Sequence, residues 1–202
     1  MDHKLTTYYK FHSKIYDLTR WSFLFGRKRL LASLPALPDG ATIIDIGCGT
    51  GFHLPQLAQK FPEAHIIGMD LSADMLHKAA MKCDPYPNIE LRNTAYNMST
   101  FDANSIDLAM CSYSLSMIDE PAPILDSINA HLKPTGAVAV LDFKATSYSW
   151  FAKWMSVNHV DFDSQLFSLL DDRFDTQTSF EKGVYSNLWN FGLFVGTKLS
   201  AS

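Results

Sequence analysis

The most constraining feature of the sequence is a glycine-rich loop that follows a short apolar run. The run Ala41–Ile46 leads into three glycines at alternate positions, Gly47, Gly49 and Gly51. Glycines at the end of a strand let the backbone turn tightly, and they let a ligand approach the main chain without a Cβ in its way. The helix expected next, Leu54–Phe61, would offer unpaired N–H groups to an anionic group such as a carboxylate. The loop therefore predicts a ligand-binding strand–turn–helix unit.

The spacing of these glycines departs from the dinucleotide-binding fingerprint. That fingerprint places glycines at its first, third and sixth positions, whereas Phe52 stands in the sixth place here and Gly51 in the fifth. One acid, Asp45, lies two residues before the loop, and another, Asp70, closes the next apolar run, Ala64–Met69. An acid at that strand end can accept hydrogen bonds from both hydroxyl groups of a ribose. The alternatives are that the loop is only a glycine turn and that Asp70 only caps a helix. The two features together favour a nucleoside-binding site.

Short apolar runs alternate with helical patterns along most of the chain, which predicts an α/β domain with a mostly parallel sheet. The runs expected as strands are Ala41–Ile46, Ala64–Met69, Ile89–Asn93, Ile106–Ser112 and Ala137–Phe143. The segments expected as helices are Leu54–Phe61, Ala73–Lys82 with Ser72 as its N-cap, Pro121–Leu132 and Trp150–Leu170. Two last strands, Thr176–Lys182 and Phe191–Lys198, follow each other closely and should pair antiparallel.

The front of the chain is expected to form a helical lid. From Leu5 to Leu34, aromatic and apolar residues recur at spacings of three and four, and a second helix, Trp21–Leu34, should end before a turn at Pro35–Gly40. We expect one domain over residues 1–202, with the lid at 1–34 and the ligand-binding core at 41–143. The remainder, 144–202, would supply helices and the two last strands.

Composition excludes several classes of function. A net charge of −4 and a pI near 5.9 argue against general binding of nucleic acid. The three cysteines include no C-x-x-C pair, so we expect no disulfide framework and no metal site, and a reducing compartment is favoured. No apolar run approaches the ~20 residues of a membrane span, and the first residues do not form a secretory signal. We expect a cytoplasmic protein, either free or peripheral on the inner face of the cell membrane.

The motifs resemble those of class I S-adenosylmethionine-dependent methyltransferases. The loop with Asp45, the segment Leu71–Leu76 after the ribose acid and the turn Leu132–Gly136 match the family pattern, although Thr94 stands where the family usually has an acid for the adenine amino group. The resemblance implies a Rossmann-like fold, S-adenosylmethionine as cofactor and S-adenosylhomocysteine as product. It implies that the cofactor-binding residues are Tyr16, Asp45, Gly47, Cys48, Gly49, Gly51, Asp70, Leu71, Met75, Thr94, Ala95 and Ser112.

Three further segments bear on the methyl acceptor: Tyr16–Arg27, Ser112–Met117 and Leu141–Phe143. Together they resemble the bacterial betaine-lipid N-methyltransferases, which implies that the acceptor is the homoserine amine of a diacylglyceryl-homoserine lipid. The bacterial phosphatidylethanolamine N-methyltransferases have a similar lid and are one alternative. Quinone and other small-molecule methyltransferases share the core and are another, and a cofactor-binding module without catalysis is a third.

The candidate catalytic residues, in positioning roles, are Tyr16, Tyr113 and Asp142. Tyr16 would close the lid over the methionine part of the cofactor, or else pack on the sheet. Asp142 would hold the substrate ammonium, or else cap the next helix. The remaining candidates form two groups. Five aromatic residues would form a box around a cation or else pack in the core, and two histidines would take up a proton from the substrate amine. These are Tyr8, Tyr9, Tyr113, Trp150 and Trp154, and His12 and His159.

Basic and apolar residues interleave between Arg20 and Leu34. The basic side chains are Arg20, Arg27, Lys28 and Arg29. This pattern predicts a helix at an anionic membrane surface, in contact with a lipid substrate. The alternative is a lid helix whose apolar face packs on the sheet and whose charges lie in water.

Overall fold

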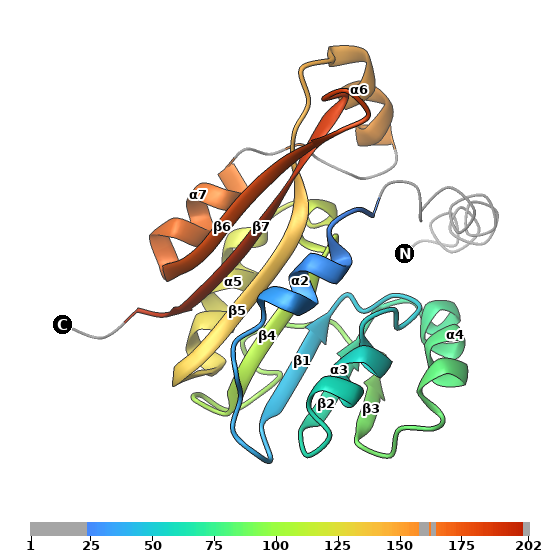
Figure 1. The fold of residues 1–202 in the computed structure, drawn as a ribbon, viewed down its shortest axis with the longest axis vertical. Coiled ribbons are helices and arrows are strands. Elements are labelled where there is room, and N and C mark those ends of the chain that lie inside the picture. The colour runs from blue at the N-terminus through green and yellow to red at the C-terminus, as the bar shows by residue number, and fades with distance from the viewer. Residues whose placement is uncertain (1–23, 158–161, 163–164, 200–202) are drawn as a thin grey trace.

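The computed structural model describes residues 24–157, 162 and 165–199. Among the described residues, seven strands form one sheet in the order β3-β2-β1-β4-β5-β7-β6 (Figure 1). The strands are β1 (Thr42–Ile46), β2 (His65–Met69), β3 (Ile89–Arg92), β4 (Ile106–Ser112), β5 (Leu132–Ala145), β6 (Phe174–Val184) and β7 (Trp189–Lys198). The helices are α2 (Arg27–Ser33), α3 (Leu54–Lys60), α4 (Ala73–Cys83), α5 (Pro121–His131), α6 (Ser149–Val157) and α7 (Gln165–Arg173), with a short 3-10 helix, η1 (Leu115–Met117).

The first five strands are parallel, and the order of the sheet reverses at β1. In this strand Asp45 lies beside Gly68 of β2 on one side and Met110 of β4 on the other. The chain moves outward from β1 to β2 and β3, and then returns to place β4 on the opposite side. At such a reversal the loops after neighbouring strands diverge and leave a crevice, where ligands of open α/β sheets bind.

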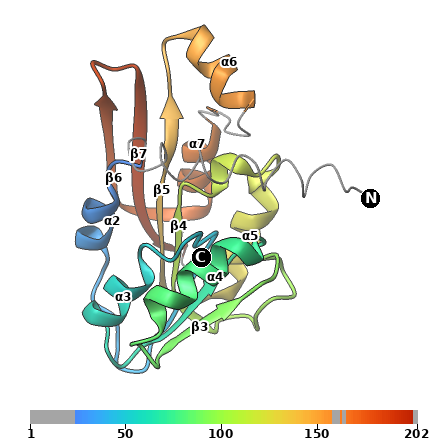
Figure 2. The same cartoon turned by 90° about the vertical axis from the view of Figure 1, so that its right-hand side faces the viewer.

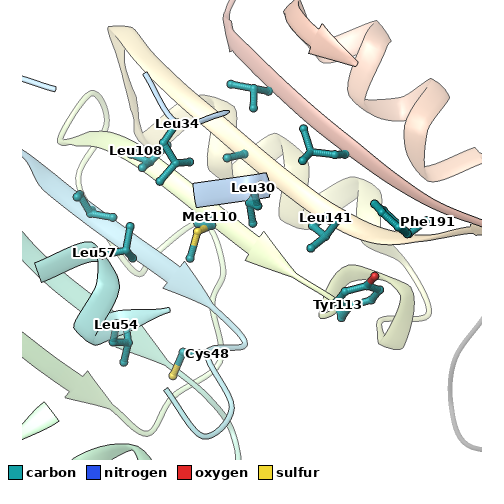
Figure 3. Packing of buried hydrophobic residues seen from close by; sticks show 14 of the residues in the cluster. Leu30, Leu34, Cys48, Leu54, Leu57, Leu108, Met110, Tyr113, Leu141 and Phe191 are labelled. Atoms are coloured by element: carbon teal, nitrogen blue, oxygen red, sulfur yellow. The ribbon is translucent and has the colours of Figure 1, made fainter. Parts of the chain in front are cut away.

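Helices cover both faces of the sheet, as Figure 2 shows from the side. On one face, α2, α3 and α4 bury Leu30, Leu54 and Leu76 against the strands. Figure 3 shows Leu30 in the same layer of side chains as Met110 of β4 and Leu141 of β5. On the other face, α5 and α7 bury a second apolar layer. Each fully buried leucine stabilises the fold by ~1.5–3 kcal/mol relative to an exposed one.

The parallel core and the antiparallel pair at the end of the sheet agree with the predicted fold. Ser72 caps α4 as expected, since its hydroxyl accepts a hydrogen bond from the Met75 N–H at 3.3 Å. β7 runs antiparallel to both β5 and β6. Strand β5 begins at Leu132, earlier than expected. Leu132 pairs with Ile106 and Ala137 with Leu108, so the predicted turn between them is a break in register rather than a loop before the strand.

Two helix predictions were wrong in extent. The described part of Trp21–Leu34 becomes helical only at Arg27, because Gly26 has a left-handed φ of 82° that ends the preceding turn. The segment Trp150–Leu170 forms two helices instead of one. Side chains of α6 join the apolar layer shared with α2, whereas those of α7 join the layer on the opposite face. One continuous helix cannot pack on both faces of a sheet.

Several predicted lid and site residues lie outside the described residues. They are Tyr8, Tyr9, His12, Tyr16, Arg20 and His159. Among the described helices, none has the length and apolar character needed to cross a bilayer.

Candidate active site

A cavity of about 200 Å³ lies at the carboxyl end of β1, between the glycine loop and α2. Its walls come from the end of β1, the loop, the start of α3, the end of β4 and the start of α2. The lining residues are Leu24, Arg27, Asp45, Gly47, Cys48, Gly49, Thr50, Phe52, His53 and Ser112. The structure therefore brings together five of the predicted cofactor residues: Asp45, Gly47, Cys48, Gly49 and Ser112.

The glycine loop is held tightly against the neighbouring strand. The backbone N–H groups of Gly47 and Cys48 both donate to the carbonyl of Met69, at 2.8 and 2.9 Å. Gly47 has a φ of 72°, and a Cβ there would lie 2.5 Å from the Cβ of Ser114. A side chain at Gly47 is thus excluded both by backbone conformation and by space. This explains the loop's first glycine and keeps the main chain open toward the cavity.

Asp70 ends β2 and helps to hold the same loop. One carboxylate oxygen accepts from the Gly49 N–H and the other from the Ser72 N–H, each at 2.8 Å. A carboxylate oxygen can accept two hydrogen bonds, so both oxygens retain capacity for the hydroxyl groups of a ribose. The next residue, Leu71, is 74% exposed, although it is a large apolar side chain. An apolar ligand surface such as an adenine ring would cover it.

The other predicted adenine-side residues lie at the same edge of the sheet. The Asn93 side-chain amide donates to the backbone carbonyl of Asp70 at 2.9 Å, which ties the loop after β3 to the end of β2. Thr94 and Ala95 follow and are exposed, while Met75 on α4 is half-buried. Gly51 does not line the cavity; it packs against α4, where a Cβ would meet Ala79 at 2.9 Å.

Asp45 is fully buried, and neither of its carboxylate oxygens accepts a hydrogen bond from any described residue. Burial raises the pKa of this carboxyl to about 7; the nearby guanidinium of Arg27 opposes that rise and the carboxylate of Asp70 adds to it. An unpartnered carboxylate in a dry environment is costly unless a cation or a proton compensates it. Asp45 therefore marks a place for a positively charged group.

His53 is a site residue that the sequence did not reveal. Its Nε2 lies 3.2 Å from the hydroxyl of Ser112, and the side chain is buried. Burial, helped by the charge of Arg27, lowers the pKa of His53 to about 3, so the imidazole is neutral at physiological pH. The residue stands at the start of α3, two positions after the last loop glycine. A polar side chain directly after the glycine loop, where the helix begins beside the cavity, could have indicated His53 as a site residue.

The predicted basic surface of α2 is not continuous. Arg27 lines the cavity, with its guanidinium 4.6 Å from the centre of the Phe52 ring. Arg29 instead lies over the ring of Phe180 on β6, at 3.5 Å. Lys28 is exposed. Consecutive helix residues point about 100° apart, which follows from 3.6 residues per turn, and these three side chains accordingly have different neighbours.

Tyr113 and Asp142 are buried beside the site and do not line the cavity. The Tyr113 hydroxyl donates to the carbonyl of Phe25 at 2.8 Å, which fastens the turn before α2 to the end of β4. Asp142 accepts from the N–H groups of Leu115 and Ser116 at 2.9 and 3.1 Å. Asp142 was predicted either to bind the substrate or to cap the next helix. The contacts observed here are those of a helix cap, but the capped helix is η1 and not the helix after β5.

The described residues of the predicted aromatic box, Tyr113, Trp150 and Trp154, do not pack around one common space. Tyr113 packs on Phe143 with ring centres 4.7 Å apart. Trp150 and Trp154 lie on α6 and are 62% and 49% exposed. They share no ring contact with Tyr113 among the described residues.

Comparisons with known proteins relate this chain to methyltransferases. Residues 43–136 match the family described as "Methyltransferase domain". Over 113 residues, the chain is 34% identical to the trans-aconitate 2-methyltransferase of Deinococcus radiodurans. That alignment covers 55% of this chain but only 41% of the relative, so the chain spans about two fifths of that relative's length.

Solved methyltransferases share the fold at low sequence identity. The geranyl diphosphate C-methyltransferase of Streptomyces coelicolor, solved with S-adenosyl-L-homocysteine, is 14% identical, with a TM-score of 0.71 over 85% of this chain and 79% of that one. A phosphoethanolamine N-methyltransferase of Haemonchus contortus is 16% identical, with a TM-score of 0.68 over 86% and 53%. Residues 43–136 therefore match a methyltransferase domain, and the described residues have the fold of class I methyltransferases.

Proposed function

We propose that this protein transfers a methyl group from S-adenosylmethionine to the amine of a lipid head group. The observation that carries the cofactor assignment is the cavity at the carboxyl end of β1. It combines a buried, unpartnered Asp45 with a glycine loop that leaves no room for a Cβ. Asp70 and the exposed Leu71 continue the same edge of the sheet. These groups fit a cationic amino-acid end, a ribose and an adenine, in that order.

The chain's own residues would bind and orient the two reactants. Asp70 would accept the ribose hydroxyls, Leu71 and Met75 would contact the adenine, and Asp45 would face the positive methionine end. When bound, the cofactor supplies a methyl group on a sulfonium centre. Transfer to an amine needs in-line positioning in a water-poor site more than acid–base chemistry. Neutral His53 and its partner Ser112 keep a polar but uncharged wall at the end of β4.

The lipid acceptor is supported by a group of exposed aromatic side chains on and around α6. Tyr148, Trp150 and Trp154 lie on or just before α6, and Tyr185 lies in the turn between β6 and β7; all are exposed. Figure 1 shows α6 and this turn at the same end of the molecule, above the carboxyl end of β5. Tyrosine and tryptophan favour membrane interfaces, because each has an apolar body and a polar group. Such a surface would bring a head group to the protein while the acyl chains stay in the bilayer.

A labelling experiment tests the cofactor and the acceptor together. The protein is incubated with methyl-labelled S-adenosylmethionine and, in parallel, with a bacterial lipid extract containing diacylglyceryl-homoserine, with phosphatidylethanolamine vesicles, and with a water-soluble metabolite extract. Mass spectrometry should find labelled methyl groups on the lipid amine, and Asp70→Ala should abolish them. Label only in water-soluble products would overturn the lipid assignment and keep the methyltransferase. That second candidate, a soluble acceptor, is favoured by the likeness to trans-aconitate methyltransferase.

A further inference from the structure

The loop after β3 is fastened to the rest of the protein at two places. At its start, the Asn93 side-chain amide donates to the backbone carbonyl of Asp70 at 2.9 Å. Farther along the loop, the Tyr96 hydroxyl lies 2.7 Å from Nδ1 of His131, the last residue of α5. Between these two contacts the chain exposes the pair Thr94–Ala95, which is expected beside the adenine. The exposed pair is therefore held from both sides.

His131 makes two hydrogen bonds to this loop and is itself buried, with 1% of its surface exposed. Its Nε2 lies 3.0 Å from the carbonyl of Met98, and because a carbonyl oxygen only accepts, Nε2 carries the hydrogen of that bond. The imidazole also meets the rings of Tyr96 and Phe101 edge-on, with ring centres 5.5 and 5.9 Å from its own. A single buried group thus fixes one side chain and one backbone carbonyl of the loop.

The surroundings of this contact are otherwise apolar. Tyr96 belongs to the apolar layer that α5 buries, together with Leu125 and Ile128. A hydroxyl or imidazole that loses its partner in such surroundings stays unpaired, so breaking either bond is costly. His131 is also anchored through its own backbone, since its carbonyl accepts from the Ser105 N–H at 2.8 Å. The loop is therefore fastened to a helix end that is itself held in place.

The position of the loop matters because Thr94 offers no carboxylate to the adenine. It stands where related methyltransferases usually have an acid, and its hydroxyl donates to the Ala95 carbonyl at 3.4 Å. Hydroxyl and backbone oxygens reach a ligand only where the backbone places them, because no long side chain can adjust their position. Selection of the base then depends on how accurately the loop is held.

We propose that His131 is a positioning residue for the base of the cofactor. It holds Tyr96 and Met98 so that oxygens of the Thr94–Ala95 pair accept from the 6-amino group of adenine. His131 acts through the loop, from a helix on the opposite face of the sheet from α2, α3 and α4. This inference rests on the proposed function and adds to it a specificity determinant that lies outside the cavity.

Calorimetric titration with two related ligands tests this role. S-adenosylhomocysteine carries the 6-amino group, whereas S-inosylhomocysteine has a carbonyl oxygen in its place and differs only at that edge of the base. The wild-type protein should prefer the adenosyl compound at least about tenfold, because the inosyl carbonyl leaves the loop oxygens without a donor. His131→Leu should reduce this preference to about threefold or less, mainly by weakening the binding of the adenosyl compound.

A double variant separates positioning from stability. His131→Leu and Tyr96→Phe each leave one buried polar group without its partner, so each should lower the melting temperature. Combining the two substitutions removes both partners, and the double variant should regain part of that stability. It should not regain the preference for the adenosyl compound, because the loop still lacks its attachment. A preference that returns together with the melting temperature would make His131 a packing residue only.

Ser127→Ala is the matched control on the same helix. It removes a buried hydroxyl that donates to the Pro123 carbonyl at 2.8 Å, and it should change neither affinity. If the wild-type protein has no preference, or if His131→Leu weakens the two ligands equally or not at all, the inference is wrong although the protein still binds the cofactor. If the wild-type protein binds neither ligand, the proposed function fails, and this inference fails with it.

Discussion

Asp45, near the end of β1, and Asp70, directly after β2, lie in contrasting environments. The Asp70 carboxylate accepts two backbone N–H groups and is only partly buried. The Asp45 carboxylate is fully buried and accepts none. The two backbone hydrogen bonds hold the Asp70 carboxylate in position, so it can accept further hydrogen bonds without losing much conformational entropy. Burying the Asp45 carboxylate without a hydrogen-bond partner costs free energy when no ligand is bound. A ligand group of opposite charge would reduce that cost.

Replacing Asp70 should impair cofactor binding strongly. Asp70→Ala removes the acceptors proposed for both ribose hydroxyls and also releases the Gly49 N–H from the carboxylate that now fixes it. The affinity for S-adenosylmethionine, measured by calorimetry, should fall at least about tenfold, equivalent to ~1.4 kcal/mol. Asp74→Ala, in the first turn of α4, is the matched control and should bind normally. Equal affinities for the two variants would show that the ribose does not lie at Asp70.

The stability of the cofactor-free protein should depend on the ionisation of Asp45. Its folded-state pKa is about 7, raised by burial from 3.8. Between these pH values the folded protein holds a proton that the unfolded chain has released, so the free energy of unfolding falls as pH rises and levels off above pH 7. A shift of this size corresponds to at most ~4 kcal/mol.

Urea unfolding at pH 5 and pH 8 measures this effect. Asp45→Asn removes the titrating group and should reduce the loss of stability between the two pH values. Asp142, whose pKa burial raises to about 6, contributes in the same direction and is present in both proteins. An identical loss in the variant and the wild type would mean that Asp45 is already ionised when the protein folds.

The positions of single residues could be predicted where the motif itself fixes the geometry, while their role in binding the cofactor stays a proposal. Gly47, Asp45 and Asp70 follow from the turn and the strand ends, and the structure places them together at one edge of the sheet. Arg27 and His53 could not be assigned in this way. The direction of an arginine side chain depends on where α2 begins, and that depends on packing of Gly26 against a strand 165 residues later, at Phe191.

Among the helices and strands, the apolar strands of the parallel core were predictable because both of their faces are buried. Every residue of β4 is buried, as the apolar stretch Leu108–Cys111 within it indicates. The division between α6 and α7 was not predictable, because both segments have helical patterns and differ only in the face of the sheet on which they pack. The early start of β5 was missed for a related reason: Leu132 belongs to the strand only because Ile106 is available to pair with it.

Removing the Asp142 carboxylate should destabilise the loop after β4. Asp142→Ala leaves the N–H groups of Leu115 and Ser116 without their acceptor in a buried position. Each unsatisfied group costs ~1–3 kcal/mol, so the free energy of unfolding should fall by about 2–6 kcal/mol in chemical denaturation. Asp119→Ala, an exposed acid just after η1, should be nearly neutral. If Asp142→Ala keeps its stability but loses the acceptor substrate, the side chain binds substrate after all.

For the complete fold, the exposed aromatic end around α6 predicts association with bilayers. Replacing both Trp150 and Trp154 by Ser should lower the affinity for phosphatidylethanolamine/phosphatidylglycerol vesicles at least about tenfold, because each buried ring contributes on the order of 1.5–3 kcal/mol. Salt should have a smaller effect than the Trp substitutions, since Arg27 lines the cavity and Arg29 lies over Phe180, so that the basic residues of α2 form no continuous surface. Sedimentation with vesicles measures this. Met81→Ser, an exposed apolar residue on α4, is the control; a loss there of similar size would argue against a specific membrane-facing end.

The position of β7 has a consequence for how the protein is made. This strand is the last of the described strands, yet it lies between β5 and β6 in the sheet. During synthesis, the free edge of β5 and the backbone of β6 therefore lack the strand with which they pair until Trp189–Lys198 has left the ribosome. An unpaired edge beside a buried strand is a template for pairing with other chains. A chain cut short before Trp189 is thus an aggregating product rather than a smaller enzyme, even though every proposed cofactor contact among the described residues precedes the cut.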